Sequence, residues 1–313
     1  MKYIVTGGAG FIGSNLVDKL LVDGHQIIVV DNLSSDESRQ RIESKELSNW
    51  DIDNPIILNE DIVTMTDFSA FENSHGMFHL AALPRVQPSI SDPIKYHSTN
   101  VNGTLNMLVA CKEMGIKRFV FSSSSAVYGD AKIIPTSETS SFNPVSPYAL
   151  HKIIGEQYCQ LFEKIYDLET FSLRYFNVFG ERQPLSGPYS LVMGIFANQL
   201  LNGLPLTING DGEQRRDFIY VGDVVDANLA CMTKKHSNDN IFNIGSGLNI
   251  SVNELADMFN KTASRINNPP LIEARQTLAD ISKANKILNW NPKIALSDWI
   301  EIYKEGLGLL FKS

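Results

Sequence analysis

Cysteine is scarce in this sequence, which holds three: Cys111, Cys159 and Cys231. An odd number of widely spaced cysteines on predicted helices indicates buried, reduced thiols rather than a disulfide framework, and this favours a cytoplasmic protein. No group of cysteine and histidine residues has the spacing of metal ligands, so we expect no metal site.

Positive charge is also in short supply, with 27 Lys and Arg against 35 Asp and Glu and a formal net charge of −8. Without a block of basic residues, neither nucleic acid nor an anionic membrane is an expected partner. The apolar runs are too short to span a bilayer, and the N-terminus opens directly into a predicted strand, without room for a signal peptide. A chain of 313 residues can bury a large core in one large or two moderate domains.

The first part of the chain alternates predicted strands and helices. We expect strands over 2–6, 26–31, 56–60, 77–81, 117–123 and 170–176, and helices over 11–23, 66–74, 96–115 and 147–166. Residues 32–55 are polar and predict a surface loop with a short helix. This alternation is typical of an α/β fold in which helices cover both faces of a parallel sheet and ligands bind at the carboxyl ends of the strands.

A glycine-rich turn, TGGAGFIG over Thr6–Gly13, lies between the first strand and the first helix. Gly8, Gly10 and Gly13 fit the dinucleotide-binding pattern G-x-G-x-x-G, and Gly7 offers an overlapping G-x-x-G-x-x-G spacing. Turns are often rich in glycine for purely local reasons. Here the strand before and the helix after the turn favour a site where backbone N–H groups approach a pyrophosphate.

The second strand ends in an acid, Asp31. Its distance from the glycines matches that of a carboxylate that hydrogen-bonds the adenosine ribose, and it would repel a 2′-phosphate. Asp31 and Asn32 are also ordinary loop residues, but the pattern favours NAD over NADP. Asp61-Ile62 ends the third strand, where the two residues would either flank the adenine or form a simple turn. The fourth strand ends in Leu80–Ala82, whose small residues would either let a cofactor pass close by or only pack against their neighbours.

Two further motifs point to chemistry. Four serines, Ser122–Ser125, follow the fifth strand and would place a hydroxyl at the sheet edge, or form a polar loop. Ser146 and Pro147 predict the start of a helix on which Tyr148 and Lys152 share one face. An ammonium close to a phenol lowers its pKa, which makes tyrosine a usable base near neutral pH.

Together these motifs resemble the extended short-chain dehydrogenase/reductases, and more narrowly the NAD-dependent nucleotide-sugar 4-epimerases acting on UDP-hexoses and UDP-N-acetylhexosamines. The resemblance rests on the glycine turn, the serine run with Val127–Gly129, the pair Tyr148 and Lys152, and RYFNVFG over Arg174–Gly180. It implies a Rossmann-type doubly wound parallel sheet with a smaller C-terminal α/β substrate domain. The NAD-binding domain would take residues 1–176, with 219–250 returning to it, and the nucleotide-sugar domain 177–218 and 251–313.

The resemblance also implies roles for the motif residues. Tyr148 would be the base, Lys152 would hold the nicotinamide ribose and tune Tyr148, and Ser124 would hydrogen-bond the sugar C4 oxygen during inversion through a 4-keto sugar. The cofactor would be held by Gly7, Gly10, Phe11, Ile12, Gly13, Asp31, Asn32, Asp61, Ile62, Leu80, Ala81, Ala82, Asn100, Ser122, Tyr148, Lys152 and Tyr175.

The same resemblance suggests a set of substrate contacts: Arg85, Ser124, Asn177, Val192, Arg216, Arg275 and Thr277. Arg216 matches the family's phosphate arginine, although an ion pair with Asp217 or Asp211 would equally explain it. A segment that carries a second phosphate arginine in the family is missing, and Arg275 is the available replacement. Thr277 falls where a small residue accompanies use of 2-acetamido sugars, so we expect both plain and N-acetylated UDP-hexoses to fit.

Neighbouring activities of the same family differ in the residue that follows the catalytic hydroxyl. Dehydratases and the xylose-forming decarboxylase carry an acid after the catalytic hydroxyl, whereas Ser125-Ala126 follow Ser124 here. A reductase or oxidase of the same fold stays open, as does a non-catalytic NAD-binding scaffold, although Tyr148 and Lys152 argue for catalysis. The family's habit of pairing through two helices predicts a homodimer built on 96–115 and 147–166.

Overall fold

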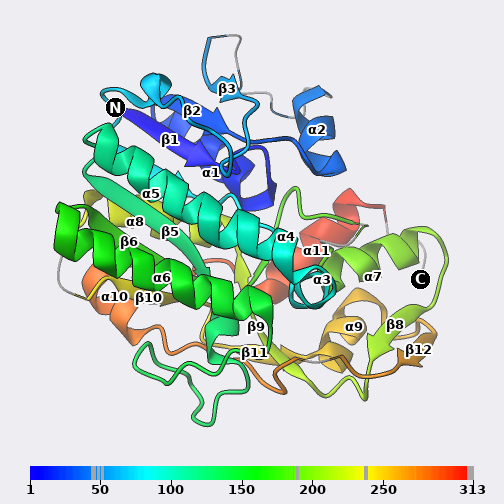
Figure 1. The fold of residues 1–313 in the computed structure, drawn as a ribbon. Coiled ribbons are helices and arrows are strands. Elements are labelled where there is room, and N and C mark those ends of the chain that lie inside the picture. The colour runs from blue at the N-terminus through cyan, green and yellow to red at the C-terminus, as the bar shows by residue number, and fades with distance from the viewer. Residues whose placement is uncertain are drawn as a thin grey trace.

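The computed structural model describes residues 1–43, 47, 50, 53–185, 187, 190–235, 239–271 and 273–308. A seven-stranded sheet runs through its centre in the order β10-β6-β5-β4-β1-β2-β3, and every neighbouring pair is parallel (Figure 1). Its strands are β1 (Lys2–Thr6), β2 (Gln26–Val30), β3 (Ile56–Leu58), β4 (Gly76–His79), β5 (Arg118–Ser124), β6 (Glu169–Tyr175) and β10 (Ile241–Ile244). The predicted doubly wound sheet is therefore present.

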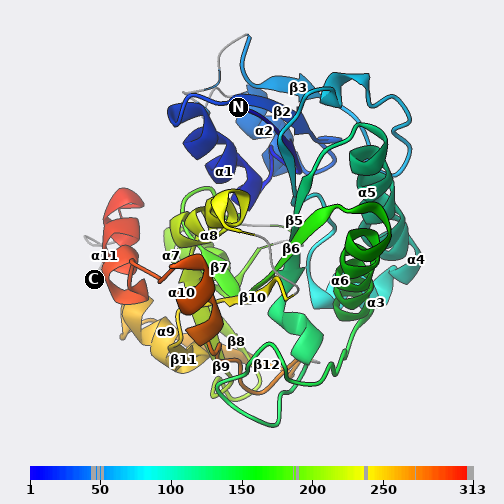
Figure 2. The same ribbon diagram turned by 90° about the vertical axis from the view of Figure 1, so that its left-hand side faces the viewer.

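Helices cover both faces of this sheet (Figure 2). One face packs against α1 (Phe11–Val22), α8 (Val221–Thr233) and α10 (Ser282–Leu288), and the other against α5 (Thr104–Glu113) and α6 (Pro147–Tyr166). The alternation along β1 explains the two layers, because Val5 joins the first apolar cluster and Ile4 the second.

The ends of α6 follow its sequence signals closely. The Ser146 hydroxyl accepts a hydrogen bond from the Ala149 amide at 3.2 Å, Pro147 occupies the first turn, and Asp167 ends the helix in a left-handed conformation. The expected helix over 147–166 is confirmed with these bounds.

Two other helix predictions need correction. The expected helix over 66–74 is only a 3-10 turn, η1 (Ser69–Phe71), because Phe68 and Phe71 are drawn into the apolar cluster below the sheet. The helix expected over 96–115 begins earlier in the structure, at Pro93. It consists of α4 (Pro93–His97), a π-helical segment, η2 (Ser98–Gly103), and then α5.

A smaller α/β part has its own apolar cluster. It contains β7 (Asn177–Phe179), β8 (Leu206–Asn209), β9 (Arg215–Tyr220), β11 (Asn249–Ser251), β12 (Arg265–Asn268), α7 (Val192–Leu201), α9 (Val252–Asn260) and α11 (Leu296–Gly306). β11, β9 and β7 form one sheet and β12 and β8 another. The remaining elements are α2 (Asp36–Glu43) after β2, α3 (Val86–Ser91) after β4, and the 3-10 turn η3 (Ser125–Tyr128) after β5.

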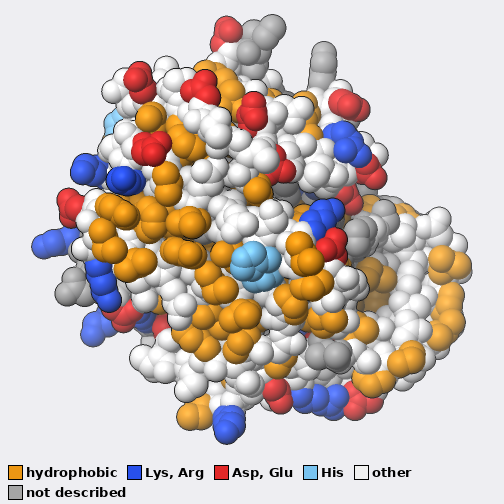
Figure 3. Space-filling view, viewed as in Figure 1, with side chains coloured by type: hydrophobic (Ala, Val, Ile, Leu, Met, Phe, Trp, Pro, Cys, Tyr) orange, Lys and Arg blue, Asp and Glu red, His pale blue; other side chains and the backbone are white. Residues whose placement is uncertain are grey.

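Apolar side chains gather on the outer surface over α5 and α6 (Figure 3). Those of α6 that are exposed include Leu150, Leu161, Ile165 and Tyr166. Their spacing, with Leu161 and Ile165 four residues apart, places them along one stripe of the helix. Among the described residues, none of the helices is long and apolar enough to cross a membrane.

Candidate active site

A cavity of about 770 Å³ lies over the carboxyl ends of β1, β2, β4 and β5, and the smaller part supplies its far wall. All of the predicted cofactor residues except Asn100 line it: Gly7, Gly10, Phe11, Ile12, Gly13, Asp31, Asn32, Asp61, Ile62, Leu80, Ala81, Ala82, Ser122, Tyr148, Lys152 and Tyr175. Of the predicted substrate residues it gathers Arg85, Ser124, Asn177, Arg216 and Thr277. Sheet topology thus brings together motifs that lie up to 270 residues apart in the chain.

The glycine turn is as tight as its sequence predicts. Gly7 has φ +69°, and its carbonyl accepts a hydrogen bond from the Gly10 amide at 3.1 Å. A Cβ on Gly13 would lie 2.1 Å from that carbonyl oxygen, so only glycine fits there. α1 then begins at Phe11 without a capping side chain, which leaves its first amide donors facing the cavity for an anion.

Asp31 sits at the end of β2, beside this turn. Its carboxylate accepts hydrogen bonds from the amides of Ala9, at 3.0 Å, and Leu33, at 2.9 Å. Burial raises the pKa of Asp31, while those amides and the charge of Arg41 oppose the shift. Asp61 is tied to the same region, because it accepts a hydrogen bond from the Asn32 amide group at 3.0 Å. These residues fit the adenosine half of NAD.

Ser124, Tyr148 and Lys152 meet at the other end of the cavity. The Lys152 ammonium donates to the Ser122 carbonyl at 2.6 Å and lies 5.8 Å from the centre of the Tyr148 ring. Ser124 hydrogen-bonds the Tyr148 side chain. The helical spacing of four residues and the strand end therefore deliver a phenol, a hydroxyl and an ammonium to one place.

The electrostatics of Tyr148 differ from the sequence-based expectation. Burial raises its pKa, and the groups that lower it are Ser124, through the hydrogen bond, and Arg85, through its charge. The sequence predicts that Lys152 lowers the pKa of Tyr148, but in the structure its ammonium donates to the Ser122 carbonyl. Burial lowers the pKa of Lys152 to about 8, against an opposing effect of Glu156.

His79, at the end of β4, is a buried neighbour of this centre. Its ring nitrogens lie 2.8 Å from the Thr6 hydroxyl and 3.0 Å from the Thr104 hydroxyl. Burial and the charge of Lys152 lower its pKa to about 3, so His79 is neutral at working pH.

Two predicted cofactor residues have supporting positions. The Tyr175 hydroxyl lies 3.1 Å from the Ser122 hydroxyl and accepts from the Asn228 amide group at 2.8 Å. Asn100 is not among the lining residues, and its side chain makes two hydrogen bonds with the backbone of Leu83, at 2.8 and 2.9 Å. Asn100 therefore shapes the segment after β4, and Leu83 itself lines the cavity.

Arg216, on β9, faces the cavity from the smaller part. Its guanidinium pairs with Glu273 at 3.0 Å, not with Asp217 or Asp211. Asp217 is fully buried and accepts hydrogen bonds from Ser246, Gly247 and Ala279, so it is occupied elsewhere. Arg216 is thus a cavity cation whose counter-ion is another cavity residue.

Two neighbours of Arg216 complete this wall. Thr277 pairs through its amide with the Arg215 carbonyl at 3.1 Å, which fixes its small side chain in the cavity lining. The Asn177 amide group donates to the Asp217 carbonyl at 3.1 Å.

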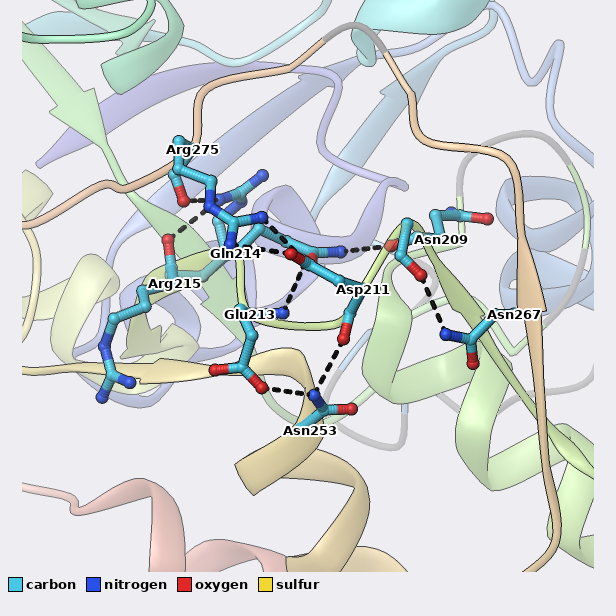
Figure 4. Close-up of polar contacts among 10 residues, drawn as sticks. Asn209, Asp211, Glu213, Gln214, Arg215, Asn253, Asn267 and Arg275 are labelled. Atoms are coloured by element: carbon cyan, nitrogen blue, oxygen red, sulfur yellow. Dashed lines mark hydrogen bonds and ion pairs between the residues drawn. The ribbon is translucent and has the colours of Figure 1, made fainter.

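The structure does not support two predicted substrate contacts. Arg275 lies outside the cavity, where its guanidinium makes two hydrogen bonds with the Asp211 carboxylate, at 2.7 and 2.9 Å (Figure 4). Its backbone is held by the Arg215 amide, which turns the side chain toward the 209–215 turn. Val192 begins α7 but does not line the cavity, whereas its neighbour Leu191 does.

Sequence reasoning missed several charged residues of the cavity lining, and two of them, Arg41 and Glu273, make polar contacts with other parts of the site. Arg41 lies in the stretch assigned to a surface loop, yet it is buried, and its guanidinium donates to the Ala9 carbonyl at 3.0 Å beneath the glycine turn. Glu273 lies in the segment for which the sequence predicts only Arg275 and Thr277 as site residues. Neither residue has a local signal, because each is placed by contacts with residues far away in sequence.

Comparisons with known proteins agree with this geometry. Residues 3–245 match the NAD dependent epimerase/dehydratase family. The UDP-glucose 4-epimerase of Mycolicibacterium smegmatis is 35% identical over 306 residues, which cover 96% of this chain and 96% of that protein. Among solved structures, UDP-glucose 4-epimerase from Thermotoga maritima with UDP-glucose has a TM-score of 0.88 and 35% identity, covering 100% of this chain and 99% of that one.

A second similar structure is the UDP-N-acetylglucosamine 4-epimerase from Methanobrevibacter ruminantium in complex with UDP-N-acetylmuramic acid. Its TM-score is 0.87 at 33% identity, over 99% of this chain and 98% of that one. The range that the family match covers contains the glycine turn, Asp31, Tyr148 and Lys152. This chain belongs to the NAD dependent epimerase/dehydratase family.

Proposed function

We propose that this protein is an NAD-dependent 4-epimerase of UDP-sugars. The observation that carries the proposal is the convergence of Ser124, Tyr148 and Lys152 at one end of the cavity that begins at the glycine turn and Asp31. A phenol, a hydroxyl and an ammonium beside a dinucleotide site suit the removal and return of a hydride at a carbon that bears a hydroxyl.

Each residue has a definite task in this reaction. NAD, when bound, supplies the nicotinamide that accepts a hydride from sugar C4 and gives it back. Tyr148 takes the proton of the C4 hydroxyl, Ser124 hydrogen-bonds the C4 oxygen, and Lys152 holds the nicotinamide ribose. When the hydride returns to the opposite face of the 4-keto sugar, Tyr148 gives the proton back to the oxygen, and the C4 configuration is inverted.

Inversion requires the 4-keto sugar to turn over without leaving. The site must therefore hold the UDP part tightly and the sugar loosely. Arg216 offers a guanidinium to the diphosphate, whose geometry suits phosphate oxygens. Asn177 lines the same wall, while Thr277 and Ala274 are small residues that leave room for the sugar.

The roomy sugar end predicts that 2-acetamido sugars are substrates alongside UDP-glucose and UDP-galactose. The similarity to a UDP-N-acetylglucosamine 4-epimerase supports this range. Thr277→Tyr should lower turnover of UDP-N-acetylglucosamine by at least about 10- to 200-fold and leave UDP-glucose turnover within about threefold, because the added phenol ring is larger than the single methylene that already discriminates to that extent in a pocket. Equal losses for both sugars would contradict the role of Thr277.

The main test follows the ratio of UDP-glucose to UDP-galactose by chromatography, without added cofactor. The two acetamido counterparts are assayed as substrates in the same way. Wild-type protein that retains NAD should bring either hexose to the same equilibrium mixture. Tyr148→Phe should lower kcat by about 10²- to 10⁴-fold, the range expected for loss of a general base. NADH accumulating with UDP-glucose would indicate an oxidase or reductase, and no turnover at all would indicate a scaffold.

The division of labour between the two parts of the chain is also proposed. Residues 1–176 and 219–250 would bind NAD, and 177–218 and 251–313 would bind the UDP-sugar. The pairing of β10 with β6 supports the return of the second segment to the central sheet. Arg216 and Thr277 support the assignment of the substrate side.

A homodimer is proposed on the apolar stripe of α6 together with α5. The stripe includes Leu161 and Ile165, which are 45% and 58% exposed. Apolar patches of this kind mark protein interfaces more often than isolated apolar residues do. Light scattering should give twice the monomer mass, and Leu161→Glu should yield monomers. Ile133→Glu, on another exposed apolar residue, is the control that should stay dimeric.

The cytoplasm is the proposed location. All three cysteines are free and buried, which suits a reducing compartment. Cell fractionation with an antibody to the protein would place it, and recovery in a membrane or secreted fraction would contradict the proposal.

A further inference from the structure

Ser123 lies in the middle of the serine run, and the proposed reaction gives it no task. Its hydroxyl is buried and donates a hydrogen bond to the carboxylate of Glu156, on α6. Glu156 follows Lys152 by one helical turn and Tyr148 by two, so the three side chains project from the same side of α6. Three turns of the helix are therefore each hydrogen-bonded to the serine run, in the pairs Ser124–Tyr148, Ser122–Lys152 and Ser123–Glu156.

Glu156 has a second partner on the neighbouring strand, β6. Arg174 lies directly opposite Ser123 in the pairing of β5 with β6, and its guanidinium makes two hydrogen bonds with the Glu156 carboxylate, at 2.8 and 2.6 Å. Both side chains of this ion pair are 2% exposed. The guanidinium also donates to the Tyr128 hydroxyl at 2.7 Å. One carboxylate on α6 thus receives donors from two adjacent strands of the central sheet.

Next to this ion pair, the contact between α6 and β5 is close and apolar. A Cβ on Gly155 would lie 2.4 Å from the ring of Phe121, and Cys159 and Phe162 of α6 belong to the same apolar cluster as that ring. Apolar contacts have no preferred direction. They hold the helix against the sheet, but they restrain its position along the strand only weakly.

The ion pair supplies the missing direction. Its net contribution to stability is small, because the cost of taking both charges out of water cancels much of their attraction. Hydrogen bonds, by contrast, weaken steeply when their angles change. A carboxylate that is held by donors from two strands therefore tolerates little movement of α6 along β5.

Resting on the function proposed above, we propose that Ser123, Glu156 and Arg174 are positioning residues of the reaction, which fix α6 at one place along β5. Tyr148 and Lys152 project from the two preceding turns of α6. The placement of the helix therefore decides whether the phenol reaches the sugar C4 hydroxyl and whether the ammonium reaches the nicotinamide ribose. A misplacement of about 1 Å can cost about 10²-fold in rate.

The test replaces the polar cluster by apolar residues in a triple variant, Ser123→Ala with Glu156→Met and Arg174→Met. Because no charge is left unpaired, this variant should unfold near the wild-type temperature. Its kcat should nevertheless fall about 100-fold, with the KM for UDP-sugar nearly unchanged, because the smaller part of the chain holds the UDP. The Kd for NAD, measured by calorimetry, should rise about tenfold, since Lys152 no longer meets the ribose.

Arg118 and Glu169 provide the matched control. They lie opposite each other at the other end of the same two strands, and their side chains hydrogen-bond at 2.8 Å. The other hydrogen bonds of Arg118 go to the carbonyls of Cys231 and Lys234 at the end of α8, on the other face of the sheet. Arg118→Met with Glu169→Met should therefore keep wild-type kcat and NAD affinity.

Ser123→Ala alone is the milder variant, because the ion pair stays, and it should lower kcat about 2- to 10-fold, the effect of one hydrogen bond. Wild-type kcat in the triple variant would overturn the inference, and if that variant does not fold, wild-type kcat in Ser123→Ala would do so. An equal fall in the control variant would also overturn it, because the fall would then follow from any weakening of the β5–β6 pairing. Wild-type protein that shows no epimerisation would instead overturn the proposed function. The NAD affinities test the inference in that case too, because they do not depend on turnover.

Discussion

Replacing Gly13 by alanine should disable the dinucleotide site by forcing the glycine turn open. The added Cβ would meet the Gly7 carbonyl oxygen at 2.1 Å and the Gly8 Cα at 2.8 Å. A carbon normally approaches a carbonyl oxygen no closer than about 3.3 Å, so the turn and the helix must separate by about 1 Å. Both clashing groups are backbone, and no side-chain rotation relieves them.

The expected cost follows from that geometry. Overpacking of a tight site costs about 1–3 kcal/mol, and we expect the upper end because the backbone itself must move. This corresponds to a fall in Tm of about 6 °C for a chain of this size. The displaced amides at the start of α1 would also lose their contacts with the pyrophosphate, which should weaken NAD binding about 10- to 100-fold, since a hydrogen bond to a charged group contributes about 1.5–3 kcal/mol.

The assay is a graded series measured by thermal unfolding and by calorimetric titration of NAD. Gly10→Ala, whose Cβ would lie 3.1 Å from the same oxygen, should show a smaller loss. Gly306→Ala, at the end of α11 with no atom within 4 Å, should keep wild-type NAD affinity and Tm. Wild-type affinity and Tm in Gly13→Ala would refute the steric reasoning.

Three further predictions concern residues in or near the cavity. Asp31→Asn should weaken NAD binding about tenfold and reduce discrimination against NADP, because the repelling carboxylate is gone; an unchanged ratio of the two Kd values would argue against a ribose contact. Glu273→Gln should tighten UDP binding about two- to fivefold in calorimetry, because Glu273 pairs with Arg216 and so competes with the diphosphate for its guanidinium. This range corresponds to the free energy of a partly exposed ion pair. Weaker UDP binding in this variant would show that Glu273 contributes to binding rather than opposing it. The pKa of His79 is lowered from 6.5 to about 3 by burial and by Lys152, so the unfolded chain takes up the proton first as pH falls. Because of His79, the free energy of unfolding should fall by about 1 kcal/mol for each pH unit below 6.5, as measured by urea unfolding. His79→Gln should make this pH dependence less steep.

Much of the active site was predictable because its signals are local. The strand–glycine–helix order, the acid at the end of β2, and the spacing of Tyr148 and Lys152 each depend on a few consecutive residues. A parallel sheet then aligns all strand ends at one edge, so correct local assignments also place distant motifs together. For the same reason the bounds of α6 followed from Ser146 and Pro147.

What the tertiary structure alone decided is which way individual side chains point and which charges meet. Both Arg216, which matches the family's phosphate position, and Arg275, the available replacement for a missing segment, are predicted phosphate contacts, but backbone pairing turns Arg275 toward Asp211 and leaves Arg216 in the cavity with Glu273. The helix expected at 66–74 gave way to a single turn because burying two phenylalanines outweighed helix propensity. Side-chain direction and charge pairing depend on long-range contacts, and no local pattern in the sequence records them.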